Sequence, residues 1–404
     1  MKVCLIAPRS PFLLKENVMG PLGLWYLGAV IKASGRHDVS YCDLGLGDTI
    51  PFADAYGVTG TTPQRVELLS LPNTLRAINP DALIIGGGVH LTTCDEDGPV
   101  SGYNVTVKGE GERVILHILE RTEPGQCNVF WDTERIDDLD NLPFPDRSEA
   151  HRYDYRIDGI PTTTMITTRG CPYQCAFCVK AVWGKSYFER TADNVYQEAK
   201  CLKDTGWDAI MFFDDTLAVN KKRLYSICVA LKALNMKWRC LIRGDQVTED
   251  VATAMSDAGC VEVGVGVESG SARILRDINK GEKVATIERG IGILRKAGIR
   301  VKAFFIVGLP GENEESLKET EDFILRVRPD DVDISILTVF EGSAISFHPE
   351  QYDLQILQRG GWYKGTPGKY ECGVRTSSLT PLEILQARDY LESRFKDARM
   401  LACT

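Results

Sequence analysis

Short apolar segments alternate with helical segments along most of this 404-residue chain, and this alternation restricts the fold more than any other feature. In the N-terminal part, helical patterns span 21–33, 63–77 and 109–119. Between them, buried strands are predicted at 3–7, 39–42, 56–60, 82–85 and 105–107. Strand–helix alternation favours a parallel, doubly wound sheet, on which ligands bind at the carboxyl ends of the strands. We therefore predict an α/β chain with an N-terminal Rossmann-like domain.

The same alternation resumes after residue 161. Strands are predicted at 163–168, 209–213, 238–242, 261–267, 301–307 and 333–337, with helices at 193–204, 221–234, 248–258, 283–297 and 314–327. Six β/α units at this spacing predict a partial (β/α)6 barrel, related to the eight-stranded TIM barrel. In that architecture, the residues that follow the strands converge at one end of the barrel, which is the functional face.

Shifts in composition divide the chain into four parts: a domain over 1–125, a linker over 126–160, the barrel over 161–340 and a C-terminal segment over 341–404. The linker is polar and contains Pro143 and Pro145. A helix is predicted at 381–395, with Thr380 as its N-cap. The aromatic residues that we expect to close the barrel mouth are Trp362, Tyr363 and Tyr370.

The overall charge excludes some classes of partner. The formal net charge is -9, whereas a phosphate backbone is bound by clustered Lys and Arg, so no nucleic-acid partner is expected. No apolar stretch approaches the ~18 residues of a membrane span, and the first apolar run ends at Pro8, too early for a signal peptide. We therefore expect a cytoplasmic protein without a membrane partner.

Three cysteines fall within eight residues, in the run TTRGCPYQCAFC. Cys171, Cys175 and Cys178 have the spacing C-x3-C-x2-C and follow the first predicted barrel strand. Three thiolates on one loop can bind three irons of a 4Fe–4S cluster, which leaves the fourth iron open to bind and activate another molecule. A zinc site would need a fourth ligand nearby, and the next cysteine, Cys201, lies in a predicted helix. A thioredoxin-type motif would use two cysteines at the start of a helix, so we interpret the loop as an iron–sulfur reaction centre.

Polar residues and glycines follow the other barrel strands. These residues are Asp214, Asp215, Arg243, Glu268, Ser269 and Gly308, and Val307 is the last residue of the strand before Gly308. The Glu268 carboxylate could accept hydrogen bonds from ribose hydroxyls, and Arg243 could bind a carboxylate through two hydrogen bonds. Two alternatives stay open: Asp215 could cap a helix, and Arg243 could pair with Asp245.

Together these motifs resemble the radical S-adenosylmethionine (SAM) superfamily. The resemblance covers about residues 161–340 and rests on the cysteine loop with its aromatic Phe177, the paired aspartates, and the segments GVESGS and GLPGE. It implies that the three cysteines ligate a 4Fe–4S cluster whose open iron binds the amino and carboxylate groups of SAM. One electron, from a reductant such as a flavodoxin or a ferredoxin, would then cleave SAM to methionine and a 5′-deoxyadenosyl radical.

The same resemblance implies roles for the residues that follow the strands. Asp214 or Asp215 would contact the methionine amino group, Glu268 the ribose, and Val307 with Gly308 the adenine. The other residues of this half that we expect to bind a cofactor are Phe177, Arg243 and Ser269.

Residues 1–120 resemble the cobalamin-binding domain that precedes the barrel in one subgroup of this superfamily, the class B methyltransferase-like proteins. The residues expected to bind cobalamin are Pro8, Leu22, Gly23, Gly86, Gly87, Gly88, His90, Gly109 and Glu110. The signature D-x-H-x-x-G, whose histidine binds cobalt from below, is absent, since Asp43 is followed by Leu44 and Gly45. Members of this subgroup commonly lack that histidine. His90 could line the site or belong to the core.

The resemblance implies an enzyme that abstracts hydrogen from an unactivated carbon and transfers a methyl group to it, with a small molecule or a peptide as substrate. Two alternatives stay open. The radical chemistry could end in a cyclisation, rearrangement or oxidation, or the cluster and corrinoid could form a sensor module. The polar strand ends argue against a sensor, because a sensor needs no SAM site. A methylthiotransferase is disfavoured, because Cys4, Cys42 and Cys94 do not resemble the ligands of a second cluster.

Overall fold

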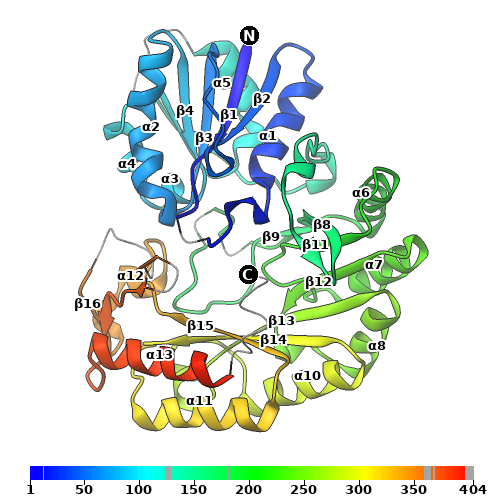
Figure 1. Cartoon of the computed structure of the whole chain (residues 1–404), viewed down its shortest axis with the longest axis vertical. Coiled ribbons are helices and arrows are strands. Elements are labelled where there is room, and N and C mark those ends of the chain that lie inside the picture. Colours follow the sequence, from blue (N-terminus) through cyan, green and yellow to red (C-terminus); the bar gives the residue numbers. More distant parts are fainter. Residues whose placement is uncertain are drawn as a thin grey trace. The chain divides into compact units, whose positions relative to one another are not determined.

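The chain forms two compact units, each a sheet covered by helices (Figure 1). The computed structural model describes residues 1–11, 13–122, 129–180, 182–184, 186–358, 365–366 and 369–395. The first unit comprises Met1–Tyr155 and Lys180–Gly184, and the second comprises Arg156–Val179 and Lys185–Thr404. Among the described residues, no helix is both long enough and apolar enough to cross a membrane.

The first unit is built on a six-stranded parallel sheet with the order β2-β1-β3-β4-β5-β6. The strands are β1 (Lys2–Ala7), β2 (Asp38–Asp43), β3 (Ala55–Thr59), β4 (Leu83–Gly87), β5 (Val105–Lys108) and β6 (Val129–Asp132). The helices are α1 (Leu22–Ala33), α2 (Arg65–Ile78), α3 (Val89–Thr93), α4 (Asp97–Val100) and α5 (Ile115–Arg121). The five predicted strands are all present, and α3 and α4 are additional short helices.

Both faces of this sheet are covered, because successive side chains of a strand point to opposite faces. On β1, Cys4 and Ile6 belong to one hydrophobic cluster together with Leu71 of α2. Val3 and Leu5 belong to a second cluster, which includes residues of α1 and α5. Helices therefore pack on both sides of the sheet, and the predicted doubly wound fold is confirmed (Figure 1).

Strand β6 lies in the segment that the sequence predicted as a linker. It pairs in parallel with β5 and extends the first sheet by one strand. The chain after it is fastened to the same unit: Tyr41 Oη donates to Asp146 at 2.7 Å, and Tyr153 Oη donates to Asp43 at 2.5 Å. The first unit accordingly continues to Tyr155, beyond the predicted boundary at 125. A single four-residue strand among polar residues leaves no periodic signal in the sequence.

The second unit contains a seven-stranded sheet with the order β15-β14-β13-β12-β11-β8-β7. Six strands run parallel, and β7 (Arg156–Ile157) is antiparallel. The parallel strands are β8 (Ile160–Met165), β11 (Ala209–Phe212), β12 (Lys237–Ile242), β13 (Cys260–Glu268), β14 (Arg300–Val307) and β15 (Asp331–Ile336). The helices that join them are α6 (Ala192–Asp204), α7 (Lys221–Leu234), α8 (Glu249–Asp257), α9 (Ala272–Asp277), α10 (Val284–Lys296) and α11 (Glu314–Val327). The predicted partial (β/α)6 barrel is confirmed.

Three details of this unit differ from the prediction, and the first is the antiparallel strand β7, which lies in the segment expected to be a linker. Strand β8 ends at Met165 rather than at residue 168, because Thr168–Arg169 forms a separate strand, β9, that pairs with β10 (Phe188–Glu189). Helix α9 has only six residues, too few for a periodic pattern to be recognised.

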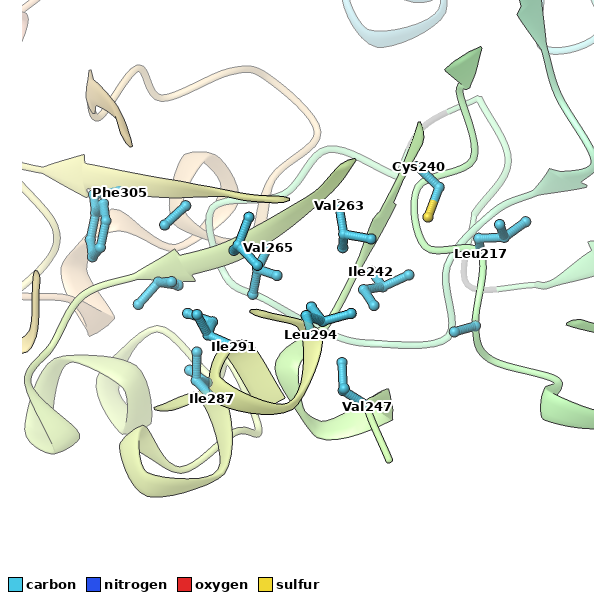
Figure 2. Close-up of a cluster of buried hydrophobic side chains, with 14 of the residues drawn as sticks. Leu217, Cys240, Ile242, Val247, Val263, Val265, Ile287, Ile291, Leu294 and Phe305 are labelled. Carbon is cyan, nitrogen blue, oxygen red and sulfur yellow. The ribbon is translucent and has the colours of Figure 1, made fainter. Parts of the chain in front are cut away.

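Figure 2 shows the core of the second unit around α10. Val263 and Val265 of β13 pack with Ile287, Ile291 and Leu294 of α10, and all five side chains are fully buried. The three helical residues recur at intervals of three and four, which places them on one face of the helix.

The C-terminal segment contains α12 (Ala344–Phe347), four two-residue strands and the predicted helix, α13 (Pro381–Phe395). The strands are β16 (Gln355–Ile356), β17 (Gly365–Thr366), β18 (Lys369–Tyr370) and β19 (Val374–Arg375). A capping box starts α13: the Thr380 amide donates to the Glu383 carboxylate at 2.7 Å, and the Glu383 amide donates to Thr380 Oγ1 at 3.4 Å. Arg388 Nε donates to the Ile334 carbonyl oxygen of β15 at 3.3 Å and so fastens the helix to this strand.

Trp362 and Tyr363 lie outside the described residues. Closure of the barrel mouth by the C-terminal aromatic residues therefore stays a prediction.

Two glycines allow α10 to approach the turn after β12. A Cβ atom on Gly290 would lie 2.4 Å from the carbonyl oxygen of Gly244, and a Cβ atom on Gly244 would lie 2.7 Å from Cα of Ile287. Gly292, in the same helix, is exposed, and a Cβ atom there would have no neighbour within 4 Å.

We predict that Gly290→Ala lowers the free energy of unfolding by about 1–3 kcal/mol, because the helix must move away from the turn. Gly292→Ala should instead raise it by up to about 1 kcal/mol, since alanine favours the helix and its methyl group meets no obstacle. Urea denaturation of both variants beside the wild type measures the difference. Equal effects of the two substitutions would contradict the packing argument.

Candidate active site

The cysteine loop, residues 171–178, lies beyond the carboxyl end of β8, and its three thiols are partly exposed. Its backbone is held at three points. The Ala176 amide donates to the Ile278 carbonyl at 2.8 Å, and the Ile345 amide donates to the Ala176 carbonyl at 3.2 Å. Asn279 Nδ2 donates to the Gln174 carbonyl at 2.9 Å. The segment after α9 and the start of α12 thus give the loop a defined conformation.

Asp214 anchors the segment that leads into the cysteine loop. Its carboxylate accepts hydrogen bonds from the Thr167 amide at 3.0 Å, from Thr167 Oγ1 at 2.9 Å and from Thr168 Oγ1. The side chain is completely buried, and this burial raises the pKa of Asp214 above its ordinary value. Asp215 is exposed, and it does not cap α7, whose N-cap is Asn220. The structure therefore separates the two aspartates that the sequence treated as equivalent.

A buried group of charges follows β13. Lys280 Nζ donates to Glu268 Oε1 at 2.9 Å and lies 3.6 Å from Glu282 Oε2. Burial would lower the pKa of Lys280, but the nearby Glu268, Glu282 and Cys175 together raise it above its ordinary value. The absence of a side chain at Gly266 makes room for this pair, because a Cβ atom there would lie 2.6 Å from Glu268 Oε1.

The backbone at the end of β13 aims Glu268 at this lysine. The register between β13 and β14 shifts between Gly266 and Glu268, and Glu268 has a φ of 67°, a left-handed conformation that is uncommon for glutamate. Ser269 does not share this direction. Its hydroxyl lies 3.2 Å from Thr320 Oγ1 and accepts from the Ser271 amide at 3.1 Å, so it packs the turn against α11.

Arg243 joins three segments around the cysteine loop. Its guanidinium donates to Asp245 through Nε at 3.2 Å and Nη2 at 3.1 Å, and Nη2 also donates to the Lys280 carbonyl at 2.9 Å. The face of the guanidinium lies 3.6 Å from the centroid of the Tyr173 ring. The pair with Asp245, one of the two alternatives left by the sequence, is present in the structure. The edge of the guanidinium that was expected to bind a ligand carboxylate is therefore used by Asp245.

Positive charge lies close to the second cysteine. Burial raises the pKa of the Cys175 thiol, and the charges of Lys280 and Arg243 oppose that rise. These cations would favour a thiolate at Cys175. Phe177, in the same loop, is partly buried and packs against the hydrophobic core of the unit.

The turn after β14 is held by a buried carboxyl group. Val307 is buried, and the amide of the next residue, Gly308, donates to Glu312 Oε2 at 2.5 Å. Burial raises the pKa of Glu312 from its ordinary value of 4.5 to about 8. A Cβ atom on Gly308 would lie 3.1 Å from Ile384, so α13 packs directly against this turn.

In the first unit, the expected cobalamin residues at the strand ends lie where backbones approach closely. β1 pairs with both β2 and β3, so the strand order reverses there and forms a topological switch point. The Pro8 carbonyl, after β1, accepts from Gln64 Nε2 at 2.8 Å. Gly88, after β4, has a φ of 91°, and a Cβ atom on it would lie 2.2 Å from Thr59 Oγ1 at the end of β3. Residues with a side chain rarely adopt this positive φ, and the short distance to Thr59 leaves no room for a Cβ atom at position 88.

His90 belongs to the interior of this unit. It is fully buried, its Nε2 lies 2.9 Å from Asp97 Oδ2, and its Nδ1 lies 3.3 Å from Thr62 Oγ1. Arg65 Nε in turn donates to Asp97 Oδ2 at 2.8 Å. Burial lowers the pKa of His90. His90 is thus a buried, hydrogen-bonded residue of this unit, and its place beside cobalamin stays a prediction.

The remaining expected cobalamin residues differ in their surroundings. Gly86 packs against Leu91 and Tyr103. Glu110 is buried, and its Oε2 accepts from the Ile136 amide at 2.6 Å, so this carboxylate fastens the chain after β6. Leu22 is buried at the start of α1, whereas its neighbour Gly23 is exposed; the last two of this group are Gly87 and Gly109.

Among the described residues, no group of three or more His, Cys, Asp or Glu side chains is placed around a single metal position. A single zinc ion draws its sulfur ligands to about 2.3 Å and so brings them close together. A 4Fe–4S cluster instead binds each cysteine through a different iron. The donor set of the cysteine loop, three thiols on one loop, fits the cluster chemistry.

Comparison with known proteins bears out the main prediction. Residues 165–324 match the radical SAM superfamily. This part of the chain is a radical SAM domain.

Two relatives resemble most of the chain. It is 28% identical over 383 residues to an uncharacterized methyltransferase of Pyrococcus horikoshii, covering 85% of this chain and 82% of the relative. It is 26% identical over 355 residues to the bacteriochlorophyllide d C-12(1)-methyltransferase of Chlorobaculum tepidum, covering 85% of this chain and 77% of the relative.

The fold resembles that of TsrM, a radical SAM methyltransferase from Kitasatospora setae. A structure of TsrM with cobalamin and a 4Fe–4S cluster bound gives a TM-score of 0.71 at 18% identity, over 89% of this chain and 81% of TsrM. A second structure, with tryptophan and a SAM analogue bound, gives a TM-score of 0.75 at 17% identity, over 98% of this chain and 89% of TsrM. At these identities the likeness concerns the fold.

No sequence pattern indicated three residues that lie in the cysteine loop or beside it: Tyr173 within the loop, and Lys280 and Glu282 next to it. Lys280 and Glu282 lie in the run INKGE, which resembles an ordinary charged turn. Lysine is seldom buried, so its position in the sequence gave no reason to place it inside the domain. The one available signal was a pair of charged residues about ten positions after Glu268 of the GVESGS segment.

We predict that Lys280→Met lowers the free energy of unfolding by about 3–5 kcal/mol, because Glu268 and Glu282 would remain buried without their ammonium partner. Lys200, which pairs with Asp204 at 2.8 Å on the surface of the same domain, provides the matched control. Lys200→Met should leave stability nearly unchanged, because an exposed pair contributes little. Urea denaturation measures both, and a small effect at Lys280 would refute the ion-pair argument.

Glu312 should make the stability of the radical SAM domain depend on pH. Its pKa rises on folding from 4.5 to about 8, so its contribution is complete below pH 4.5 and is lost as the pH rises to about 8. Within that window, the stability of the wild type relative to Glu312→Gln should fall by about 1.4 kcal/mol per pH unit. Denaturation curves across pH test this. Glu315→Gln, at an exposed position of α11, should show no such trend.

Proposed function

We propose that this chain is a cobalamin-dependent radical SAM enzyme that transfers a methyl group to a carbon atom of a small-molecule or peptide substrate. The observation that carries the proposal is the anchored cysteine loop beside a buried charge cluster, at the carboxyl end of a radical SAM barrel. The methyltransferase names of the two relatives and the cobalamin bound to TsrM support the choice of methyl transfer.

The residues of the cysteine loop fit a 4Fe–4S cluster. Cys171, Cys175 and Cys178 would ligate three irons, as thiolates do in such clusters. Lys280 and Arg243 would offset part of the negative charge that three thiolates bring into the site. The partial exposure of the three thiols leaves them accessible to iron during assembly.

Lys280 and Glu268 would be the main polar partners of SAM. In this structure each neutralises the other at 2.9 Å. SAM offers a carboxylate to the ammonium group and hydrogen-bond donors, its ribose hydroxyls, to the carboxylate, so each of the two side chains would keep a hydrogen-bond partner beside SAM. We therefore assign the carboxylate contact to Lys280 rather than to Arg243, whose guanidinium is bound to Asp245.

The other SAM contacts follow from the same edge of the barrel. The exposed Asp215, and not the buried Asp214, would reach the methionine amino group. Gly308 would lie beside the adenine, with its amide held by Glu312 and its surface covered by Ile384. Such contacts orient SAM and exclude water from it.

Cobalamin would bind at the carboxyl edge of the first sheet, near the switch point formed by β1 and β3. Pro8, Gly87 and Gly88 present backbone there rather than long side chains. His90 offers no nitrogen to cobalt, because both ring nitrogens contact Thr62 and Asp97. This arrangement agrees with the missing D-x-H-x-x-G signature.

When bound, the cluster would deliver one electron to cleave SAM, and cobalamin would supply the methyl group. A flavodoxin or a ferredoxin would provide the electron. The absence of a nucleic-acid partner and a cytoplasmic location remain expectations from the composition.

The test is incubation of the reconstituted protein with cobalamin, a strong reductant and SAM that carries a labelled methyl group. We expect 5′-deoxyadenosine to form and the label to appear in methylcobalamin. Cys175→Ala, which removes one iron ligand, should lose iron and form no 5′-deoxyadenosine. Cys201→Ala, at an exposed position of α6, should keep both properties.

Two other outcomes of this experiment would each favour one of the alternative functions. Formation of 5′-deoxyadenosine without any transfer of label would favour a radical cyclisation, rearrangement or oxidation. An intact cluster that does not cleave SAM under strong reductant would favour a sensor module.

A further inference from the structure

Tyr173 has no part in the chemistry proposed above, although it lies between the first two cysteines. It follows Cys171 by two residues and precedes Cys175 by two. The guanidinium of Arg243 lies 3.6 Å from the centroid of its ring, and Gln246 Nε2 donates to its hydroxyl at 3.3 Å. A cation over an aromatic face is attracted by the quadrupole of the ring, more strongly where water is excluded.

Arg243 is itself fixed from several directions. Two of its nitrogens donate to Asp245, one of them also donates to the Lys280 carbonyl, and its amide donates to Gln246 Oε1 at 3.2 Å. Gln246 Oε1 also accepts from Thr216 Oγ1 at 2.7 Å. The guanidinium is therefore a rigid surface on which the Tyr173 ring can rest.

The same short segment holds Arg243 and the backbone of the loop. The Lys280 carbonyl binds Arg243, while the two residues before it bind the loop at Gln174 and Ala176. Tyr173 therefore contacts Arg243, Arg243 binds residue 280, and the adjacent residues 278 and 279 bind the loop that contains Tyr173. The ring contact at Tyr173 and two hydrogen bonds to the loop backbone, one from the Asn279 side chain and one with the Ile278 carbonyl, thus act on residues 173–176.

We propose that Tyr173 and Arg243 form a clamp that holds the cysteine loop in its cluster-binding conformation before iron is bound. Ordering a loop costs conformational entropy for each residue. A loop that is ordered before iron arrives therefore binds the cluster with a more favourable free energy. Both residues are positioning residues, since they act through the loop. The purpose of the clamp rests on the proposed function, whereas the clamp itself is a property of the metal-free chain.

Arginine and an aromatic ring are both needed for this contact. A lysine at position 243 could keep the charge, but it could neither lie flat on the ring nor bind Asp245 through two nitrogens. A phenylalanine at position 173 would keep the ring and lose only the hydrogen bond from Gln246.

The test is hydrogen–deuterium exchange of the metal-free, full-length protein, together with iron bound per chain after reconstitution. In Tyr173→Leu, the Ala176 amide should exchange about tenfold faster, because the stacking that restrains the loop is lost. The iron bound should fall in parallel. Tyr173→Phe should restore both values to near those of the wild type. Arg243→Lys also removes the stacking of the guanidinium on the ring, so it should change both values as Tyr173→Leu does.

Tyr390 and Arg394 provide the matched control, since both belong to α13, that guanidinium lies 5.7 Å from the centroid of that ring, and the ring hydroxyl also has a hydrogen-bond partner, Glu321. Tyr390→Leu should change neither Ala176 exchange nor iron content. The clamp is refuted if Tyr173→Leu leaves Ala176 exchange unchanged, or if Tyr173→Phe is as damaged as Tyr173→Leu. Retention of iron by Cys175→Ala would refute the cluster assignment instead. The change in Ala176 exchange, measured on the metal-free protein, would still support the clamp.

Discussion

The buried pair of Glu268 and Lys280 is the interaction on which the geometry of the barrel site depends. Charges removed from water must be paired, and here the pairing extends to Glu282 and Arg243. These residues come from three different segments. The ion pairs between them therefore hold the end of β13, the turn after β12 and residues 278–282 in fixed positions relative to one another. The cysteine loop then rests on the last two of these segments. A residue with little apparent role in the sequence, Lys280, thereby organises the surroundings of the cysteines.

The two units use one architectural rule in different ways. In both, parallel strands bring their carboxyl ends to one edge, where ligands bind in this class of fold. At the edge of the barrel, charged side chains gather and neutralise each other. At the edge of the first sheet, Gly88 and the Pro8 carbonyl present backbone, and His90 turns inward to Asp97. Under the proposed function, the first edge would bind SAM through charged side chains, and the second would meet the corrin with backbone groups.

Much of this could be read from the residues alone. The strands of both sheets and the main helices were predictable because buried segments have a strong local periodicity, and the capping box at Thr380 and Glu383 is a local pattern as well. The prediction failed for β6 and α9, whose short lengths leave no periodic signal. It also failed to separate Asp214 from Asp215, because adjacent residues can differ completely in burial. The roles of Arg243 and Ser269 depend on neighbours that are distant in sequence, Lys280 and Thr320, and no local pattern encodes those contacts.

The sequence by itself determined the fold class and the kind of chemistry. Alternating buried strands and helices allow few architectures, and three closely spaced cysteines in a loop have few uses. Only the tertiary structure decided which polar residues surround the cysteines and which serve packing. Pairing of buried charges is a property of three-dimensional neighbours, and the bulge at Glu268, the stack of Arg243 on Tyr173 and the burial of Lys280 arise only when the separate strand ends meet.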